Sequence, residues 1–294
     1  MRLKSKLSYI SPYLFITPSI TILLVFAVIP IFQSIRLAFL DYNIIDASRT
    51  TFIGFQNIIR LFNDNHVWNA LYNTFIFSFG VVFGGLFISL LLALIITESW
   101  FRFPGLARSM IFIPFMLSTT IVALLWSWLY SPQFGLFNYL LSLLGLPQQA
   151  FLGDPDRALF YIIIIAIWRG LGYSITIWSA GILGLGKEHR EAAQIDGANW
   201  LQELIFVRLP QLKPTILFLT ILGFISAFQS FDLIYVLTGG GPLRRTEVLV
   251  YYIWDHAFVR LDFGYAATIA WLIFIILISL SFIQFRLIGR KDDE

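Results

Sequence analysis

Six long runs of apolar residues alternate with polar segments along this chain of 294 residues. A helix crosses the hydrocarbon core of a bilayer with about 20 apolar residues, and each run is long enough to do so. No run shows the alternation of apolar and polar residues that a strand of a membrane β-barrel requires. We therefore predict an all-α membrane protein whose six transmembrane helices form one domain, residues 1–294. The predicted spans are Tyr13–Leu40, Thr74–Thr97, Met110–Tyr130, Ala158–Leu183, Thr215–Leu237 and Tyr265–Phe285.

The composition of the chain narrows the possible functions. Hydrophobic residues make up 58% of the sequence and charged residues 13%, whereas roughly a quarter of the residues in a soluble domain are charged. Cysteine is absent, which excludes disulfides and zinc–thiolate sites, and the three histidines lack the spacing of metal ligands. The net charge of +3 gives no indication of nucleic-acid binding. We predict no catalytic residue, no metal site and no separate soluble domain.

The distribution of Lys and Arg predicts the orientation of the spans. If the spans alternate from a cytoplasmic N-terminus, twelve of these residues fall on the inner side and seven on the outer side, with Arg169 inside the membrane. This excess follows the positive-inside tendency of membrane proteins. We therefore expect both termini, and the polar segment after the fourth span, to lie in the cytoplasm.

A polar, helix-forming insert follows the fourth span, at residues 187–214. The pattern predicts a short helix over His189–Ala198, whose end is loosened by Gly197. A second helix is predicted over Trp200–Leu209, and Pro210 should stop it because proline cannot donate a backbone hydrogen bond to a continuing helix.

The chemistry of the first predicted helix favours docking onto another protein. Ala192 and Ala193 are small and leave the backbone approachable, so that the helix can enter a groove on a partner. A helix on the membrane surface would instead show a large apolar face with a rim of Lys and Arg. This helix has Glu191 and Asp196 beside its alanines, which is unsuited to anionic lipid. A loop that merely connects two spans is the structural alternative.

The order of residues in the insert resembles the EAA loop of permease subunits of binding-protein-dependent ABC importers. Two outer segments also resemble the carbohydrate-importer branch of this family, and the likeness extends over nearly the whole chain. It is similar in particular to the first permease of maltose- and glycerol-phosphate-type systems. The residues that carry the resemblance are Glu191-Ala192-Ala193, Asp196-Gly197-Ala198, Phe206, Leu209-Pro210 and Pro214 in the insert, and Phe52-Ile53-Gly54-Phe55-Gln56-Asn57 and Thr238-Gly239-Gly240-Gly241-Pro242 outside it.

The resemblance implies a fold, a mechanism and a set of partners. The fold would be that of an ABC type I importer permease in the cytoplasmic membrane of a prokaryote. Its partners would be a second, different permease that completes a heterodimer, two ATP-binding cassette subunits that bind ATP and magnesium, and an external solute-binding protein. This chain would then have no cofactor and no enzymatic activity, and the solute would be a sugar, polyol or glycoside. The implied coupling residues are Glu191, Ala192, Ala193, Asp196, Gly197 and Ala198.

The segment 181–187 also fits the pattern G-x-x-x-x-G-K of a phosphate-binding loop. The next residue is Glu188, where a Ser or Thr would hold magnesium, and a membrane span precedes the motif in place of a buried strand. A carboxylate at this position would repel phosphate. We interpret the match as a coincidence and expect a partner to hydrolyse ATP.

Polar residues inside the predicted spans mark a candidate substrate pathway, because polar side chains that face lipid are unfavourable. A sugar requires hydrogen-bonding groups and an aromatic face within a cavity. Ser226, Gln229 and Ser230 have the i, i+3, i+4 spacing of one helix face and are expected to face such a cavity. The candidate pathway residues are Phe115, Thr119, Arg169, Gly172, Tyr173, Ser226, Gln229, Ser230 and Asp232.

Two questions stay open from the residues alone. Arg169 either contacts the substrate, or it pairs with Asp232 or with the sister subunit. The competing function is an ion-coupled secondary transporter of sugars, but such transporters usually hold carboxylates deep in their spans. Here only Asp232 near one span end and Glu98 at an edge are present. A membrane enzyme or an assembly scaffold is a third hypothesis, and no paired carboxylates or nucleophile with a base support the enzyme.

Overall fold

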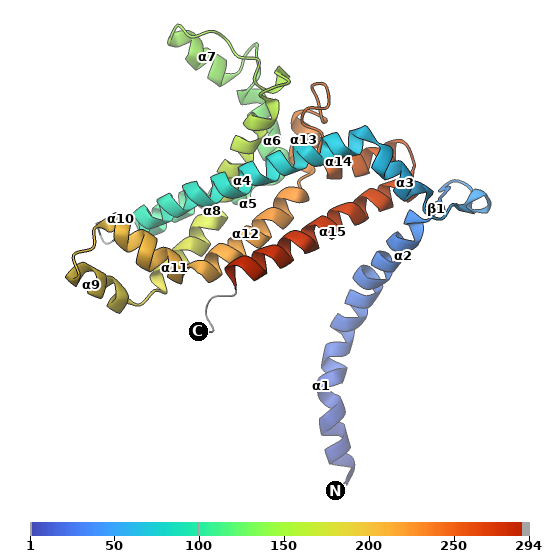
Figure 1. Ribbon diagram of the computed structural model, residues 1–294, viewed down its shortest axis with the longest axis horizontal. Helices are drawn as coiled ribbons and strands as arrows, with labels where there is room; N and C mark the ends of the chain where they lie inside the picture. Colours follow the sequence, from blue (N-terminus) through green and yellow to red (C-terminus); the bar gives the residue numbers. More distant parts are fainter. Residues whose placement is uncertain (1, 99, 290–294) are drawn as a thin grey trace. The chain divides into compact units, whose positions relative to one another are not determined.

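The computed structural model describes residues 2–98 and 100–289 (Figure 1). Arg290 and Lys291, which contribute to the predicted inner charge, lie outside the described residues. The chain divides into two compact units, and we describe each by itself. The first unit comprises Met1–Asn65 and Ile253–Leu272, and the second comprises His66–Tyr252 and Ile273–Glu294.

The predicted all-α membrane architecture is confirmed. Among the described residues, four helical segments are long and apolar enough to cross a membrane, and two bent helix pairs bring the number to six if each pair is one span. The four are Tyr13–Ala38, Asn65–Thr97, Ala158–Leu183 and Phe263–Ile288. The described part of the chain contains one pair of two-residue strands, β1 (Leu40–Asp41) and β2 (Thr51–Phe52), which are antiparallel with Leu40 opposite Phe52.

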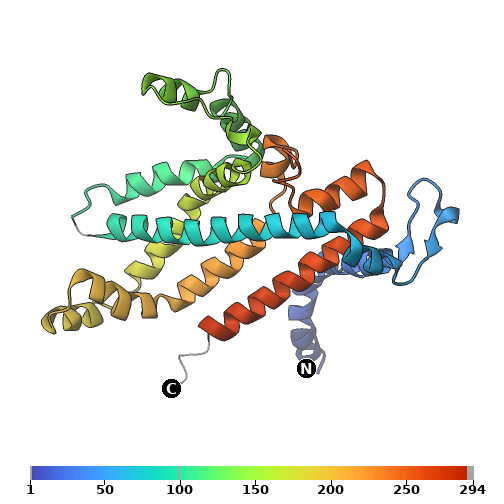
Figure 2. The same ribbon diagram turned by 45° about the horizontal axis from the view of Figure 1, so that its top comes forward.

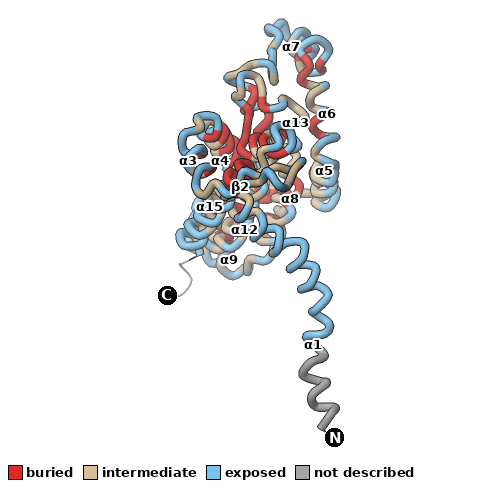
Figure 3. The backbone as a smooth tube through the Cα atoms, turned by 90° about the vertical axis from the view of Figure 1, so that its right-hand side faces the viewer, coloured by how far each residue is buried: buried red, intermediate tan, exposed pale blue. Residues whose placement is uncertain are grey.

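The first unit begins with a nearly continuous helical segment, in which the π-helical turn η1 connects α1 to α2. From Tyr13 to Ile31 its described side chains are almost all exposed, as Figure 3 shows for α1. After the short hairpin comes α3, and the unit closes with η5 and the first part of α15. The bounds are α1 (Arg2–Leu23), η1 (Leu24–Val28), α2 (Ile29–Ala38), η2 (Ala47–Arg49), α3 (Gln56–Asn63), η5 (Asp255–Val259) and α15 (Phe263–Ile288).

Buried polar contacts hold the first unit together. Asn57 is buried, and its Nδ2 donates to the carbonyl oxygens of Ala38 at 3.0 Å and Leu40 at 3.3 Å. A Cβ on Gly264 would lie 2.1 Å from the oxygen of Leu40, so only glycine fits where α15 passes the end of α2. Asn57 belongs to the outer motif that resembles the importer family, and its contacts give that motif a structural role.

Charged side chains around Asp262 add a second set of contacts in this unit. Arg60 Nη1 lies 2.7 Å from Asp262 Oδ2, and the guanidinium of Arg60 stacks over the ring of Tyr265 at 3.8 Å. Tyr265 donates its hydroxyl to Asp64 Oδ2 at 2.7 Å. Burial by itself raises the pKa of Asp262, but the neighbouring His256 ring, with its Nδ1 at 3.6 Å, and the hydrogen bond and charge of Arg60 hold this pKa below its usual value.

The second unit is built around the long helix α4 (Asn65–Thr97), which packs against α8 and α12. Its close approach to α8 depends on small residues, because a Cβ on Gly80 or Gly84 would lie 2.9 or 2.8 Å from the side chains of Ile163 and Ile167. The other helices are α5 (Pro104–Met116), α6 (Thr119–Leu129), α7 (Leu136–Leu143), η3 (Phe151–Gly153), α8 (Ala158–Leu183), α9 (Lys187–Ile195), α10 (Trp200–Glu203), η4 (Leu204–Arg208), α11 (Leu209–Gln211), α12 (Lys213–Phe228), α13 (Asp232–Leu237) and α14 (Leu249–Trp254).

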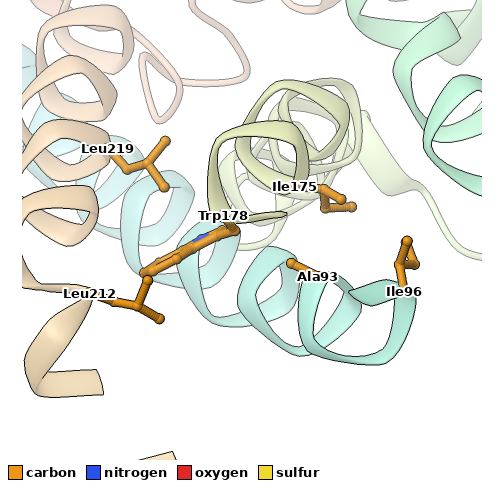
Figure 4. Close-up of a cluster of buried hydrophobic side chains, with 6 residues drawn as sticks. All are labelled: Ala93, Ile96, Ile175, Trp178, Leu212 and Leu219. Carbon is orange, nitrogen blue, oxygen red and sulfur yellow. The ribbon is translucent and has the colours of Figure 1, made fainter. Parts of the chain in front are cut away.

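A buried apolar cluster joins three of these helices (Figure 4). Trp178 of α8 lies at its centre, and its indole Nε1 donates to the buried Ser89 Oγ of α4 at 3.1 Å. Leu212, at the junction of α11 and α12, is 1% exposed. The cluster consists of Ala93 and Ile96 of α4, Ile175 and Trp178 of α8, Leu212, and Leu219 of α12.

The third predicted span is not one helix, and this prediction needs correction. The chain forms α5 and α6, which meet at an angle of 94°. Pro114 lies inside α5, three residues before Leu117 adopts an extended conformation with ψ of 146°. Proline removes a backbone donor and disfavours a continuous helix, and here the chain forms a full break.

The fifth predicted span is also interrupted. Helix α12 ends at Phe228, and α13 begins at Asp232. Ser226 therefore lies in α12, whereas Gln229 and Ser230 follow its end, so the predicted single helix face is not formed, although all three residues line one cavity. Gln229 is the C-terminal cap of α12 and Ser230 lies in the break, where the N–H of Ser230 donates to Ala227 O in a tight turn.

The glycine-rich segment after α13 folds back onto α4. Gly239 and Gly240 have positive φ of 56° and 81°, which glycine adopts readily. Asn73 Nδ2 donates to the carbonyl oxygens of Arg244 and Glu247, both at 3.0 Å, and the hydroxyl of the buried Thr74 accepts from Leu249 N at 2.9 Å. Polar residues of α4 thus fix this segment in place.

Candidate functional site: a coupling loop and an intramembrane cavity

The insert at residues 187–214 forms a compact helical loop at one end of the second unit, and α7 lies at the opposite end in both views (Figures 1 and 2). The first helix, α9, begins two residues earlier and ends three residues earlier than predicted. It ends because Gly197 has φ of 80° and the N–H of Ala198 donates back to Ala193 O at 2.9 Å, as in a Schellman motif. Gly197 therefore has the helix-ending role that the sequence predicts.

The second half of the loop starts at a capping box. Asn199 Oδ1 accepts from Gln202 N and Gln202 Oε1 accepts from Asn199 N, both at 2.9 Å. The helix does not stop at Pro210, so that prediction is wrong. A π-helical turn, η4, precedes the proline, and α11 carries the chain on to Gln211. Proline is tolerated in the first turn of a new helix because the missing N–H has no helical partner there.

The predicted coupling residues lie on an accessible part of this loop. Glu191, Ala192, Asp196 and Gly197 are exposed, and Ala193 and Ala198 are half-buried. Apolar side chains accompany them on the surface, since Ile195 is 86% exposed and Phe206 is 74% exposed. Exposed apolar side chains on a polar loop are compatible with a protein-binding surface.

An ion cluster at the base of the loop was not predicted from the sequence. Arg208 is buried, and its Nε donates to Glu203 Oε1 at 2.6 Å while its Nη1 lies 3.2 Å from Glu98 Oε1 at the end of α4. The side chains of Arg208, Glu203 and Glu98 are 6%, 4% and 17% exposed. The apolar residues around Glu203 and Arg208 are a sequence signal that could have indicated their burial, but the partner Glu98 is 110 positions away from Arg208.

A cavity of about 560 Å³ lies among α4, α6, α8 and α12, next to the break between α12 and α13. It contains eight of the nine predicted pathway residues, which come from three different predicted spans. One wall carries the rings of Phe115 and Tyr173, which stack at 5.3 Å between centroids. The eight residues are Phe115, Thr119, Arg169, Tyr173, Ser226, Gln229, Ser230 and Asp232.

Four polar side chains that line the cavity are available to a ligand. Within the described part of the chain, the side chains of these four residues form no hydrogen bond to protein atoms. The helix break at residues 229–231 places them along the cavity wall instead of on one helix face. The four are Ser226, Gln229, Ser230 and Asp232.

Arg169 lines the same cavity beside the aromatic wall. Its guanidinium carbon lies 5.8 Å from the centroid of the Phe115 ring, and its Nη2 lies 3.5 Å from Leu117 O, a carbonyl freed by the break between α5 and α6. Among the described residues no ion pair joins Arg169 to Asp232. The two charges nevertheless act on each other through space, so in this conformation Asp232 is an electrostatic neighbour of Arg169 without a direct contact.

The ninth predicted residue, Gly172, has a different environment. It is buried, and a Cβ at this position would lie 2.5 Å from Phe112 Cα and 2.6 Å from Ile111 O. Gly172 is thus the point where α8 approaches the backbone of α5 most closely among the glycines of these two helices. Its place is at a helix contact behind the cavity wall, and it is not one of the lining residues.

A family model supports what the loop and the cavity indicate. Residues 85–291 match the model of the binding-protein-dependent transport system inner membrane component. The chain belongs to this family. The match includes the whole loop at residues 187–214 and almost all of the residues that line the cavity.

The sequence is similar to those of individual relatives over nearly their full length. The chain is 34% identical to the probable ABC transporter permease protein YurN of Bacillus subtilis, with 97% of this chain and 98% of that protein covered. It is 32% identical to the trehalose/maltose transport system permease protein MalF of Thermococcus litoralis, covering 98% and 97%. Its fold is similar to a chain in the crystal structure of a bacterial ABC transporter involved in the import of the acidic polysaccharide alginate, with a TM-score of 0.85, 24% identity and complete coverage of both chains.

Family membership decides between the functions that the sequence left open. The permease is an inner-membrane, multi-pass subunit of a binding-protein-dependent ABC importer, and ATP hydrolysis resides in partner subunits of that complex. The ion-coupled transporter and the membrane enzyme are therefore set aside. The phosphate-binding pattern at 181–187 covers the end of α8 and the turn into α9, where Gly181 packs against Thr215 and Leu212.

Proposed function

We propose that this permease carries a sugar, polyol or glycoside solute through the cavity beside the break between α12 and α13. The observation that carries the proposal is the composition of the cavity lining, which combines two stacked aromatic rings with Ser, Gln and Asp side chains. Aromatic faces bind the apolar faces of sugar rings, and polar side chains bind hydroxyls. A volume of about 560 Å³ is within the range of small-molecule sites.

The substrate class has support from relatives as well as from the cavity. The relatives include the trehalose/maltose permease described above and the sn-glycerol-3-phosphate transport system permease protein UgpA of Pectobacterium atrosepticum, at 30% identity over 95% of this chain. Arg169 on the cavity wall would also suit a solute that carries an anionic group. We propose Phe115, Thr119, Arg169, Tyr173, Ser226, Gln229, Ser230 and Asp232 as the residues of the pathway.

In the proposed complex, this chain pairs with a second, different permease subunit, two ATPase subunits and an external binding protein. Both termini and the loop at residues 187–214 face the cytoplasm. The exposed helix α9 enters a cleft of an ATPase subunit, with Glu191, Ala192, Ala193, Asp196, Gly197 and Ala198 at the contact. This proposed contact is supported by three features of the short helix α9: its exposed residues, its small side chains and the exposed Ile195.

ATP hydrolysis by the reconstituted complex tests the substrate class. The permease, its sister subunit and the ATPase subunits would be placed in lipid vesicles with the cognate binding protein and a panel of sugars, polyols and glycerol phosphate. We expect one member of the panel to stimulate hydrolysis and to accumulate inside the vesicles. Stimulation by amino acids or metal ions, without stimulation by any carbohydrate or polyol derivative, would contradict the proposal.

A further inference from the structure

The ion cluster of Glu98, Arg208 and Glu203 connects the coupling loop to the helix bundle by a route other than the polypeptide chain. Glu203 and Arg208 belong to the second half of the loop, and Glu98 follows the last residue of α4. The chain itself also joins the loop to the bundle, through the turn at residues 184–186 and through Leu212. In Figures 1 and 2 the loop lies beside the end of α4, in agreement with the 3.2 Å contact between Arg208 and Glu98.

The contact between Glu203 and Arg208 depends on the π-helical turn between them. Residues five positions apart in an α-helix point about 140° away from each other, because each turn contains 3.6 residues. In the wider turn η4, Leu209 N bonds to Leu204 O, and the two side chains meet at 2.6 Å. Turns of this kind often occur at functional sites. Here the turn places Arg208 between Glu203 of the same loop and Glu98 at the end of α4.

Stability alone does not explain why this cluster is buried. Taking three charged groups out of water is unfavourable, and apolar residues of similar volume often stabilise a protein as well or better. The best-attested advantage of a buried ion pair is that it fixes the register of the elements it joins. An apolar contact tolerates sliding, whereas two short contacts to one guanidinium define a single position.

The neighbours of the cluster place it between the docking surface and the bundle. Helix α9 packs directly against η4, so a displacement of α9 moves the turn that carries Arg208. On the other side, Glu98 continues the part of α4 that carries Ala93 and Ile96, which are buried in the apolar cluster with Trp178 and Leu212 (Figure 4). The path from α9 through η4 and Arg208 to α4 is therefore continuous.

We propose that Glu98, Arg208 and Glu203 are positioning residues that pass the movement of the coupling loop to α4, and so link ATP hydrolysis to the opening of the cavity. The proposal rests on the proposed coupling role of α9. Without the cluster, the loop can still dock onto the ATPase subunit, but its movement is no longer passed to α4. ATP is then hydrolysed with less solute transported.

The decisive variant replaces the whole cluster by neutral residues of similar size, Glu98→Gln, Arg208→Met and Glu203→Gln together. This variant leaves no unpaired charge among the three residues, so we expect it to fold and assemble. In the full reconstituted complex we expect the ATPase subunits to copurify and basal hydrolysis to persist. The number of ATP molecules hydrolysed per solute molecule transported should rise by about fivefold or more, the lower end of typical coupling effects.

Single variants and a control separate coupling from charge. Arg208→Met and Glu98→Gln should be non-additive in a double-mutant cycle of the ATP-to-solute ratio, because both remove the same contact. Lys213→Met removes a positive charge five positions from Arg208, and Lys213 is half-buried and forms no ion pair among the described residues. Lys213→Met should transport with the wild-type ratio.

Two outcomes overturn different statements. A neutral triple variant with the wild-type ATP-to-solute ratio would overturn the role of the cluster, while Glu191→Lys would still abolish transport. If Glu191→Lys leaves transport and ATPase binding intact, the coupling role of α9 itself is wrong. If the triple variant fails to assemble, the cluster is a stability element and the proposal is also overturned.

Discussion

The coupling loop and the cavity belong to the same unit of the permease, but they are built in opposite ways. The loop is one continuous segment whose predicted contact residues lie within eight positions of each other and are largely exposed. The cavity combines side chains from several helices, and its shape depends on two interrupted helices. The loop therefore works through local backbone geometry, whereas the cavity works through the packing of distant segments.

This difference determines which substitutions each region tolerates. In the loop, a change matters if it alters a backbone conformation or the exposed surface of α9. Around the cavity, a change matters if it fills a helix contact or removes a polar group from the wall. Glycine has a critical role in both regions, but for a different reason in each.

The largest effect is expected in the loop. Gly197→Asp places a side chain at φ of 80°, which is unfavourable for residues other than glycine, and adds a charge to the proposed docking surface. Glu191→Lys reverses an exposed charge on α9. Both variants should insert normally into the membrane and lose more than about nine-tenths of transport, the scale of a lost docking contact. Uptake by vesicles and the amount of membrane-inserted protein measure the two properties.

Matched variants make this test specific. Gly186→Asp adds the same side chain in the turn between α8 and α9. At this position φ is not positive, and no atom lies within 4 Å of the new Cβ. Glu188→Lys reverses a second exposed charge on α9, outside the motif. Both controls should keep most of the transport activity. Equal losses in controls and test variants would mean that the loop is merely sensitive to charge.

The second prediction concerns helix packing behind the cavity. Gly172→Ala would bring its Cβ to 2.5 Å from Phe112 Cα, a backbone atom that cannot move alone. Overpacking of this kind typically destabilises a protein by about 1–3 kcal/mol, so the thermal stability and the yield of the permease should fall. Gly170→Ala meets no atom within 4 Å and should leave stability unchanged. If Gly172→Ala is stable but changes only substrate selectivity, Gly172 belongs to the pathway instead.

The contrast between the two regions also explains what the sequence could predict. Glu191 to Pro214 is a contiguous motif, and its residue order predicted a docking helix that Gly197 ends. Pro114 is a local signal for a distortion of the third span, but it does not specify the 94° angle between α5 and α6. The break at residues 229–231 contains no proline or glycine, so no local signal predicted it.

Long-range partners were the other part that the sequence did not predict. Glu98 and Arg208 are each common residues at the end of a span or in a polar loop, and only the fold brings them to 3.2 Å. The polar residues of the cavity were found for a different reason. Inside a predicted span, Arg169 and Gln229 are unfavourable next to lipid wherever their helices pack, so their presence alone indicated a protein-lined cavity.

The third prediction tests whether the two charges of the cavity depend on each other. Arg169→Asp places two carboxylates in one cavity and should reduce transport by about tenfold or more, a typical effect of an unpaired charge at such a site. Because Arg169 and Asp232 form no ion pair in the described structure, the exchange Arg169→Asp with Asp232→Arg should not restore activity. Restoration would show that the two residues pair in another conformation of the transport cycle.

The smallest effect is expected for a single hydrogen-bonding group on the cavity wall. The amide of Gln229 is exposed to the cavity and has no side-chain hydrogen bond among the described residues, so a ligand can use it without breaking a protein contact. Gln229→Leu keeps a similar size, and loss of one hydrogen bond of about 1 kcal/mol corresponds to about fivefold weaker binding. Transport at limiting solute concentration should fall. The concentration of loaded binding protein that gives half-maximal ATPase activity should stay constant, since Gln229 is proposed to bind the solute after the binding protein has released it.

Gln284→Leu is the matched control. Gln284 lies in α15 and outside the cavity lining, so this variant should have no effect on transport. An unchanged Gln229→Leu variant would assign recognition to the sister subunit or to the binding protein, and the cavity of this chain would then differ from the coupling loop in tolerating substitution.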